Sequence, residues 1–490
     1  MKLEEILAEG ACDADLPVLR QIAEVWSNLL RPDQLSGLDA TNVPERIVRV
    51  IETGDLDESA QITLASTLLE LSLCRPATLT SPLRARINLI CRPILTRLAD
   101  SLTMTPRSLP LSRTRKAHVL FVGSLQGADE GPSRSAVDYA AALALDPKVG
   151  RIEIVHSGEI APETGAYIQE ALGPRPGGPE VLLVSTLEND NFMADILGRG
   201  PCTFHMCAEP ALSPVISLAS RLGPTLMFVG TDDAPVQYAD VYWSRRSREE
   251  IQDIWGGQGA PAVFADNHVQ VLQVPGRDLP APEPLPRATL GLAGDALVIA
   301  TVGDRLDVEM DEAYITGIEL AIRDRPHCVW MVAGALPDYL SDACRQVLGP
   351  RFLHIPEPSD LARLMTTVDV YANPFRAGGG RSARLAAAAG ASLLTLDRGE
   401  VAAIAPPDFL AKDAEDYFHR LDALIALPEL LAALKARQAE HIGQSGDQKA
   451  LLTSLQKMVR TAARRYAERG EGLPLSQTVF AQPGVLAAAS

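Results

Sequence analysis

The sequence predicts an α/β protein in which two domains with parallel sheets follow an all-α N-terminal region. Residues 1–104 carry apolar side chains at helical spacing. In residues 116–275, and again in residues 297–470, short apolar strands alternate with helices, which is typical of βαβ units. Residues 275–296 are rich in proline and charge, so they mark the hinge between the two α/β domains.

Length and charge limit the class of protein. A chain of 490 residues has room for about two to four domains. Its net charge of −17 argues against nucleic-acid binding, because nothing offsets repulsion from phosphates. No run approaches about 18 apolar residues, and the acidic N-terminus lacks the apolar segment of a signal peptide. The seven cysteines are scattered, which favours reduced thiols without a metal site. We therefore expect a cytoplasmic protein with no membrane span.

The N-terminal region is predicted to be a separate helical bundle. Apolar residues recur at helical spacing from Leu16, from Ile62 and from Pro82, and Pro93 interrupts the third segment. The polar stretch Thr105–Lys116 is the expected linker. Two roles fit this bundle: a cap packed on the next domain, or a module for homo- or hetero-oligomerisation and partner docking.

The α/β elements follow in order. In the first domain we expect strands at 118–122, 151–156, 180–185, 225–229 and 239–243, and helices at 135–145, 165–172 and 215–222. In the second domain we expect strands at 297–302, 328–332, 352–355, 368–372 and 392–396, and helices at 313–322, 359–366, 381–389, 414–424, 429–442 and 448–469.

The most informative segment is a glycine loop between a strand and a helix. Gly378, Gly379 and Gly380 allow positive φ and close approach of a ligand to the backbone. The N–H groups of the following helix suit a phosphate. Arg376 and Arg381 flank the glycines, and each either contacts that phosphate or is a solvated loop charge. The alternative for the whole segment is an ordinary βα turn.

The sequence NPFRAGGGRSARLAAAAGASLLTLDRGEV resembles the nucleotide-sugar segment of GT-B glycosyltransferases, above all the O-GlcNAc-transferase-like branch and its bacterial relatives. This resemblance implies the GT-B fold, with two Rossmann-like domains facing a cleft. It implies a nucleotide sugar as the donor substrate, whose diphosphate lies at the glycines and at Ser382, with no cofactor and no bound metal. Glu400 stands close to the sugar or nucleotide in this comparison, or is simply an acid at a helix N-terminus.

A second candidate loop follows the first strand of the second domain. Gly303 and Arg305 lie where open α/β sheets bind ligands. The related enzymes have a lysine near the position of Asp307 that contacts the diphosphate, and Arg305 could supply the cation instead. The alternative is an exposed Arg305 that pairs with Asp307.

The acceptor side has a candidate base. Glu130, in Glu130-Gly-Pro-Ser-Arg134, partly resembles the family's His-x-Pro-Thr-Lys segment and stands in place of its histidine. A carboxylate can act as a general base. The alternative is an acid that complements the dipole of the next helix. Thr231 likewise replaces a histidine of the family and cannot shuttle protons near neutral pH.

One departure concerns the nucleotide ribose. The family has an acid on the helix after the glycines, at the position of Leu385, and leucine accepts no hydrogen bonds. If the site is otherwise intact, Leu385→Glu is predicted to tighten nucleotide binding. Two functions remain open: a glycosyltransferase acting on a protein or small-molecule acceptor, or a catalytically silent GT-B subunit that binds or stabilises a partner. An unrelated Rossmann enzyme is disfavoured, because no Gly-x-Gly-x-x-Gly with a ribose-binding acid follows a strand.

Overall fold

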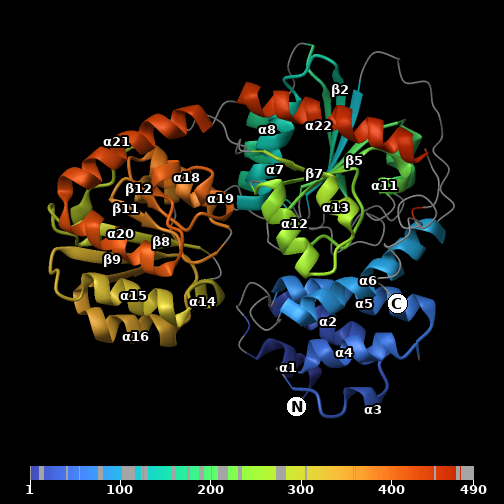
Figure 1. Ribbon diagram of the computed structural model, residues 1–490, viewed down its shortest axis with the longest axis horizontal. Coiled ribbons are helices and arrows are strands. Elements are labelled where there is room, and N and C mark those ends of the chain that lie inside the picture. Colours follow the sequence, from blue (N-terminus) through green and yellow to red (C-terminus); the bar gives the residue numbers. More distant parts are fainter. Residues whose placement is uncertain are drawn as a thin grey trace. The chain divides into compact units, whose positions relative to one another are not determined.

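The computed structural model describes most of the chain. The described residues are 2–9, 11, 16–39, 42–54, 56–74, 81–101, 116–122, 125, 131–156, 160, 162–173, 177–186, 192–199, 201–207, 219–229, 234–244, 246–271, 283–303, 306–356, 358, 360–376, 378–445, 448–470 and 475. They form two compact units, drawn in Figure 1. The first unit comprises Met1–Val271 together with Leu452–Ser490, and the second comprises Leu272–Leu451.

The N-terminal region is helical, as predicted. Its helices are α1 (Leu3–Ala8), α2 (Leu16–Leu29), α3 (Pro32–Leu35), α4 (Val43–Glu52), α5 (Glu58–Cys74) and α6 (Ser81–Ser101). The side chains that face inward form one apolar core around the buried Trp26. Helix α6 continues through Pro93, although the sequence predicts an interruption there. The region also contacts the rest of the first unit, since the Asn88 amide donates to the carbonyl of Ala234 at 3.2 Å.

The first unit contains one parallel sheet of seven described strands in the order β3-β2-β1-β4-β5-β6-β7. The strands are β1 (Lys116–Phe121), β2 (Val149–His156), β3 (Glu180–Ser185), β4 (Thr203–Met206), β5 (Thr225–Phe228), β6 (Val241–Ser244) and β7 (His268–Gln270). The helices are α7 (Gly131–Leu143), α8 (Pro162–Leu172), α9 (Phe192–Gly198), α11 (Ala219–Leu222), α12 (Arg248–Gly257) and α13 (Ala262–Asp266). The sequence predictions omit β4 and β7, which are short and contain polar residues.

A buried polar chain crosses the centre of this sheet. His118 on β1 and His205 on β4 lie side by side, with 2.8 Å between Nδ1 of His118 and Nε2 of His205. The hydroxyl of Tyr139, on α7, lies 2.8 Å from Nδ1 of His205. All three side chains are buried. Burial lowers the pKa of His118 to about 4 and lowers the pKa of His205 well below its usual value.

Because these histidines are buried, we predict that the folded first unit loses stability in acid. A histidine whose pKa is depressed by folding keeps the folded state stable at neutral pH. Stability is lost as the pH falls from about 6.5 towards about 4, because the unfolded chain binds the proton first. For His118 alone the loss approaches about 3 kcal/mol. Unfolding midpoints measured between pH 7 and pH 4.5 should fall steeply in the wild type and less steeply in His118→Gln. His327→Gln, at an exposed position, should keep the wild-type slope; equal slopes in all three proteins would contradict the prediction.

The second unit contains a parallel sheet of five described strands in the order β10-β9-β8-β11-β12. The strands are β8 (Leu297–Val302), β9 (Cys328–Ala333), β10 (Phe352–Ile355), β11 (Val370–Ala372) and β12 (Ser392–Leu394). The helices are α14 (Leu306–Glu309), α15 (Glu312–Ile322), α16 (Asp338–Leu348), α17 (Leu361–Met365), α18 (Gly380–Ala388), α19 (Gly399–Ala402), α20 (Ala414–Ala426) and α21 (Pro428–Ser445). The described residues of this unit also include three short 3-10 helices: η4 (Arg287–Leu290), η5 (Gly349–Arg351) and η6 (Pro407–Phe409).

The final helix differs from the prediction in its placement. Helix α22 (Gln448–Arg469) has the predicted bounds, but from Leu452 onward it belongs to the first unit rather than to the second α/β domain. The reason is a set of polar contacts, among them the ion pair between Arg469 and the buried Asp240, with 2.8 Å between Nε and Oδ1. In the described residues, no helix combines the length and apolar character needed to span a membrane.

Candidate functional site

The topology of the second sheet locates the candidate site. Strands β9 and β10 lie on one side of β8, whereas β11 and β12 lie on the other. The chain direction along the sheet therefore reverses between β8 and β11. Ligands of open α/β sheets bind at the carboxyl ends of the strands at such a reversal. Gly303 follows β8 there, and Asn373 with the glycine loop follows β11.

Arg376 is the central side chain of this edge. Its Nε donates to Oδ1 of Asn373 at 3.1 Å, and its Nη2 donates to the carbonyl of Val302 at 2.5 Å. Its Nη1 pairs with the carboxylate of Glu309 on α14. Burial lowers the pKa of the Arg376 guanidinium, but charge interactions with Tyr371 and Glu309 outweigh burial and hold it above its usual range. This cation is therefore committed to groups of its own unit.

Two of the predicted glycines are required by this arginine. A Cβ at Gly303 would lie 2.5 Å from Nη1 of Arg376. Gly379 has a φ of 97°, and a Cβ there would lie 2.7 Å from Nη2 of Arg376. A side chain at either position would require the guanidinium, which Asn373, Val302 and Glu309 hold, to move. The close approach that the sequence assigns to a ligand is made here by Arg376.

Glu400 holds the start of the helix that follows the glycines. The backbone N–H of Gly380, the first residue of α18, donates to Oε2 of Glu400 at 3.1 Å. Glu400 lies on the short helix α19, so two helices meet through this contact. A carboxylate at a helix N-terminus interacts favourably with the helix dipole. Glu400 lies in the first turn of its own helix, and its carboxylate also accepts the hydrogen bond at the N-terminus of α18.

The structure thus brings together Gly303, Arg376, Gly379, Gly380 and Glu400. Gly378, Arg381 and Ser382 are half-buried beside them, in the loop and in the first turn of α18. The Ser382 side chain hydrogen-bonds the Tyr371 hydroxyl. The predicted residues Arg305, Glu130 and Thr231 lie outside the described residues.

Leu385 does not line a polar pocket. It is 5% exposed and packs in an apolar cluster with Ala300, Val302 and Tyr371. The interpretation that this position faces a nucleotide ribose therefore needs correction. The side chain is part of the core between α18 and the sheet, and a carboxylate introduced there would be buried.

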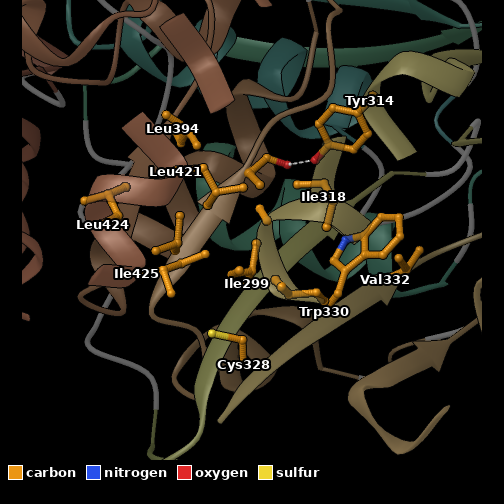
Figure 2. Packing of buried hydrophobic residues seen from close by; sticks show 14 of the residues in the cluster. Ile299, Tyr314, Ile318, Cys328, Trp330, Val332, Leu394, Leu421, Leu424 and Ile425 are labelled. Carbon is orange, nitrogen blue, oxygen red and sulfur yellow. Dashed lines mark hydrogen bonds between the residues drawn. The ribbon is translucent and has the colours of Figure 1, made fainter. Parts of the chain in front are cut away.

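Sequence reasoning missed Glu309 and the polar network beneath the site. The Tyr314 hydroxyl lies 2.8 Å from Oγ1 of Thr301 and donates to the carbonyl of Ala372 at 2.9 Å. Figure 2 shows this hydroxyl among the apolar residues of the cluster. The network ties the end of β8 to the end of β11 and so positions both loops. No local sequence pattern links Glu309 to an arginine so far along the chain.

Comparison with known proteins identifies the fold. No protein-family model and no curated protein sequence matches the chain. A mutant of the Thermobaculum terrenum O-GlcNAc transferase is similar in structure over 94% of this chain and 93% of its own length, with a TM-score of 0.57 and 14% identity. A mutant of S. aureus TarM, in complex with fondaparinux, alpha-GlcNAc-glycerol and UDP, is similar over 70% of this chain and 99% of its own, with a TM-score of 0.51 and 8% identity.

The chain has the GT-B fold of glycosyltransferases: two units with parallel sheets and an all-α region at the N-terminus. The prediction of fold class is confirmed.

Proposed function

We propose that the protein is a glycosyltransferase that binds the diphosphate of a nucleotide sugar at the N-terminus of α18 and transfers the sugar to a protein or small-molecule acceptor. The observation that carries this proposal is the hydrogen bond from the Gly380 N–H to a carboxylate oxygen. That N–H binds an anion already, and it lies where the strand order reverses. A phosphate oxygen would make the same contact.

The chemistry proposed needs no metal. In a GT-B site, a helix N-terminus and cationic side chains stabilise the leaving diphosphate, because they are fixed where negative charge develops. Gly380 and the half-buried Arg381 and Ser382 belong to the first turn of α18 and would supply these groups, with Arg305 as a further candidate cation. Glu130 is the proposed general base for the acceptor.

A catalytically silent subunit is the second candidate, and a specific observation favours it. Arg376 is paired with Glu309, and the N–H of Gly380 is bonded to Glu400. Position 385 carries a core leucine instead of an acid. A GT-B protein with these features could retain the fold and use it to bind or stabilise a partner.

Titration separates the two candidates. UDP, GDP and dTDP, and their sugars, should be titrated calorimetrically into the full chain, with release of nucleotide diphosphate measured in parallel. Under the proposal, one nucleotide diphosphate binds and its sugar is consumed. Binding without consumption of any sugar supports the silent subunit. Absence of binding by the whole panel contradicts a nucleotide site.

A further inference from the structure

Two carboxylates of the second unit occupy the groups that an anionic ligand would use. Glu309 pairs with the guanidinium of Arg376, which is 10% exposed, and Glu400 accepts the hydrogen bond of the Gly380 N–H. The two contacts lie next to each other, because Arg376 packs against Gly379 and Glu400 packs against Gly380. The site therefore contains one of its cations, Arg376, and its helix N-terminus already paired with carboxylates.

Carbon atoms of the Glu400 side chain, as well as its carboxylate, lie close to the backbone of Gly380. A Cβ built on Gly380 would lie 2.7 Å from Cβ of Glu400 and 2.9 Å from its Oε2. The whole side chain thus lies against the backbone at the start of α18. A phosphate cannot reach this N–H while Glu400 stays, since both anions need the same hydrogen bond and repel each other.

We propose that Glu400 is an intramolecular latch on the phosphate site: its carboxylate takes the place of a ligand phosphate, and a diphosphate binds only after displacing it. This inference rests on the proposed function and adds its regulation. Glu400 is half-exposed and lies on a helix of four residues, so its side chain has solvent to move into. Glu309 remains on Arg376 when Glu400 leaves, and the Gly380 N–H is then open to the ligand.

The consequence is weak intrinsic affinity for anions. The ligand must replace a charged hydrogen bond before it forms its own, and such bonds are stronger than neutral ones. Removal of the Glu400 carboxylate should tighten anion binding on the order of tenfold. Glu400→Gln should have a smaller effect than Glu400→Ala, because glutamine removes the charge but keeps an oxygen that can accept the hydrogen bond.

The test uses inorganic pyrophosphate, titrated calorimetrically into wild type, Glu400→Ala and Glu400→Gln at low ionic strength. Glu429→Gln is the matched control, since Glu429 is an exposed acid in the first turn of another helix of this unit, α21. We expect the dissociation constant of pyrophosphate to fall in both Glu400 variants and to stay unchanged in the control. If Glu400→Ala lowers the unfolding midpoint, the dissociation constant of Glu400→Gln alone is compared with that of the wild type.

The outcomes distinguish the latch from the proposed function. Equal dissociation constants for pyrophosphate in wild type and both Glu400 variants, with a nucleotide diphosphate still bound, overturn the latch and leave the proposed function standing. Equal tightening in Glu429→Gln also overturns it, because the effect would then be one of net charge. If neither pyrophosphate nor any nucleotide diphosphate binds any variant, the latch and the proposed function both fail.

Discussion

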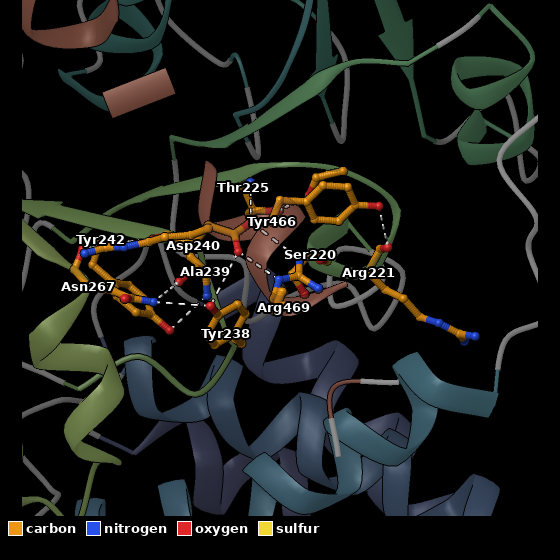
Figure 3. Close-up of polar contacts among 12 residues, drawn as sticks. Ser220, Arg221, Thr225, Tyr238, Ala239, Asp240, Tyr242, Asn267, Tyr466 and Arg469 are labelled. Atoms are coloured by element: carbon orange, nitrogen blue, oxygen red, sulfur yellow. Dashed lines mark hydrogen bonds and ion pairs between the residues drawn. The ribbon is translucent and has the colours of Figure 1, made fainter. Parts of the chain in front are cut away.

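Replacement of Arg469 by alanine is expected to destabilise the first unit by about 3–5 kcal/mol. Arg469 is on the last turn of α22, and its partner Asp240 is fully buried. Figure 3 shows the Asp240 carboxylate between Arg469 and the backbone of Thr225. Nε of Arg469 donates to Oδ1 at 2.8 Å, and the Thr225 N–H donates to Oδ2 at 3.0 Å. Without the guanidinium, a buried carboxylate would lose its countercharge.

The effect should depend on pH in a defined direction. Burial already raises the pKa of Asp240, and Arg469 opposes that rise. Loss of Arg469 raises the pKa further, so the folded variant binds a proton that the unfolded chain releases. The variant should therefore lose stability as the pH rises above the usual range of a carboxyl group, and be least affected in mild acid.

Urea unfolding of the full chain, followed by hydrogen exchange of β5, β6 and α22, measures this effect. Arg464→Ala is the control on the same helix, because Arg464 is 67% exposed and pairs with an equally exposed Glu468. Its cost should stay within about 0.5 kcal/mol. Similar losses in Arg464→Ala and Arg469→Ala would show that α22 contributes little through this ion pair.

Leu385→Glu is expected to destabilise the second unit by at least about 3 kcal/mol, because it removes a core side chain and buries a carboxyl group. This reverses the expectation from the sequence, in which the same change restores an acid to a ribose site. Leu385 is 5% exposed and packs in the apolar cluster between α18 and the sheet. The new carboxyl group would have a raised pKa, so the loss should grow as the pH rises.

Unfolding midpoints and nucleotide titrations of the same variants test this prediction. Leu385→Met keeps volume and polarity and should cost less than about 1.5 kcal/mol. Leu320→Glu places the same acid at a position that is 55% exposed on α15, and its effect should be within about 0.5 kcal/mol. A stable Leu385→Glu that binds a nucleotide diphosphate more tightly than wild type would contradict the core position and restore the ribose interpretation.

The local sequence pattern predicted several elements with their bounds, but not every long segment: α12 and α16, of 10 and 11 residues, were not predicted. Strands β3, β8 and β10 have the predicted bounds, as does α22. Strands β4 and β7 were missed. His205 is satisfied by His118 and Tyr139, which are distant in sequence, so its burial has no local signal.

The backbone of the candidate site could be predicted from the sequence, but the partners of its charged side chains could not. The glycine loop, its place after a strand and the helix behind it follow from local sequence, and Gly379 does have positive φ. The partners of the charged residues do not follow. Arg376 was a candidate for phosphate, yet Glu309 and Asn373 hold it, and Glu400 was placed near a sugar, yet it bonds Gly380.

By itself the sequence determined the α/β class, the order of most elements and the position of the glycine loop, because strand and helix patterns and glycine conformations are properties of neighbouring residues. Only the tertiary structure decided that α22 joins the first unit, that Leu385 is core and that Glu400 neutralises the start of α18. Those outcomes depend on which side chains meet across the fold, where a buried charge requires a partner that the local sequence does not specify.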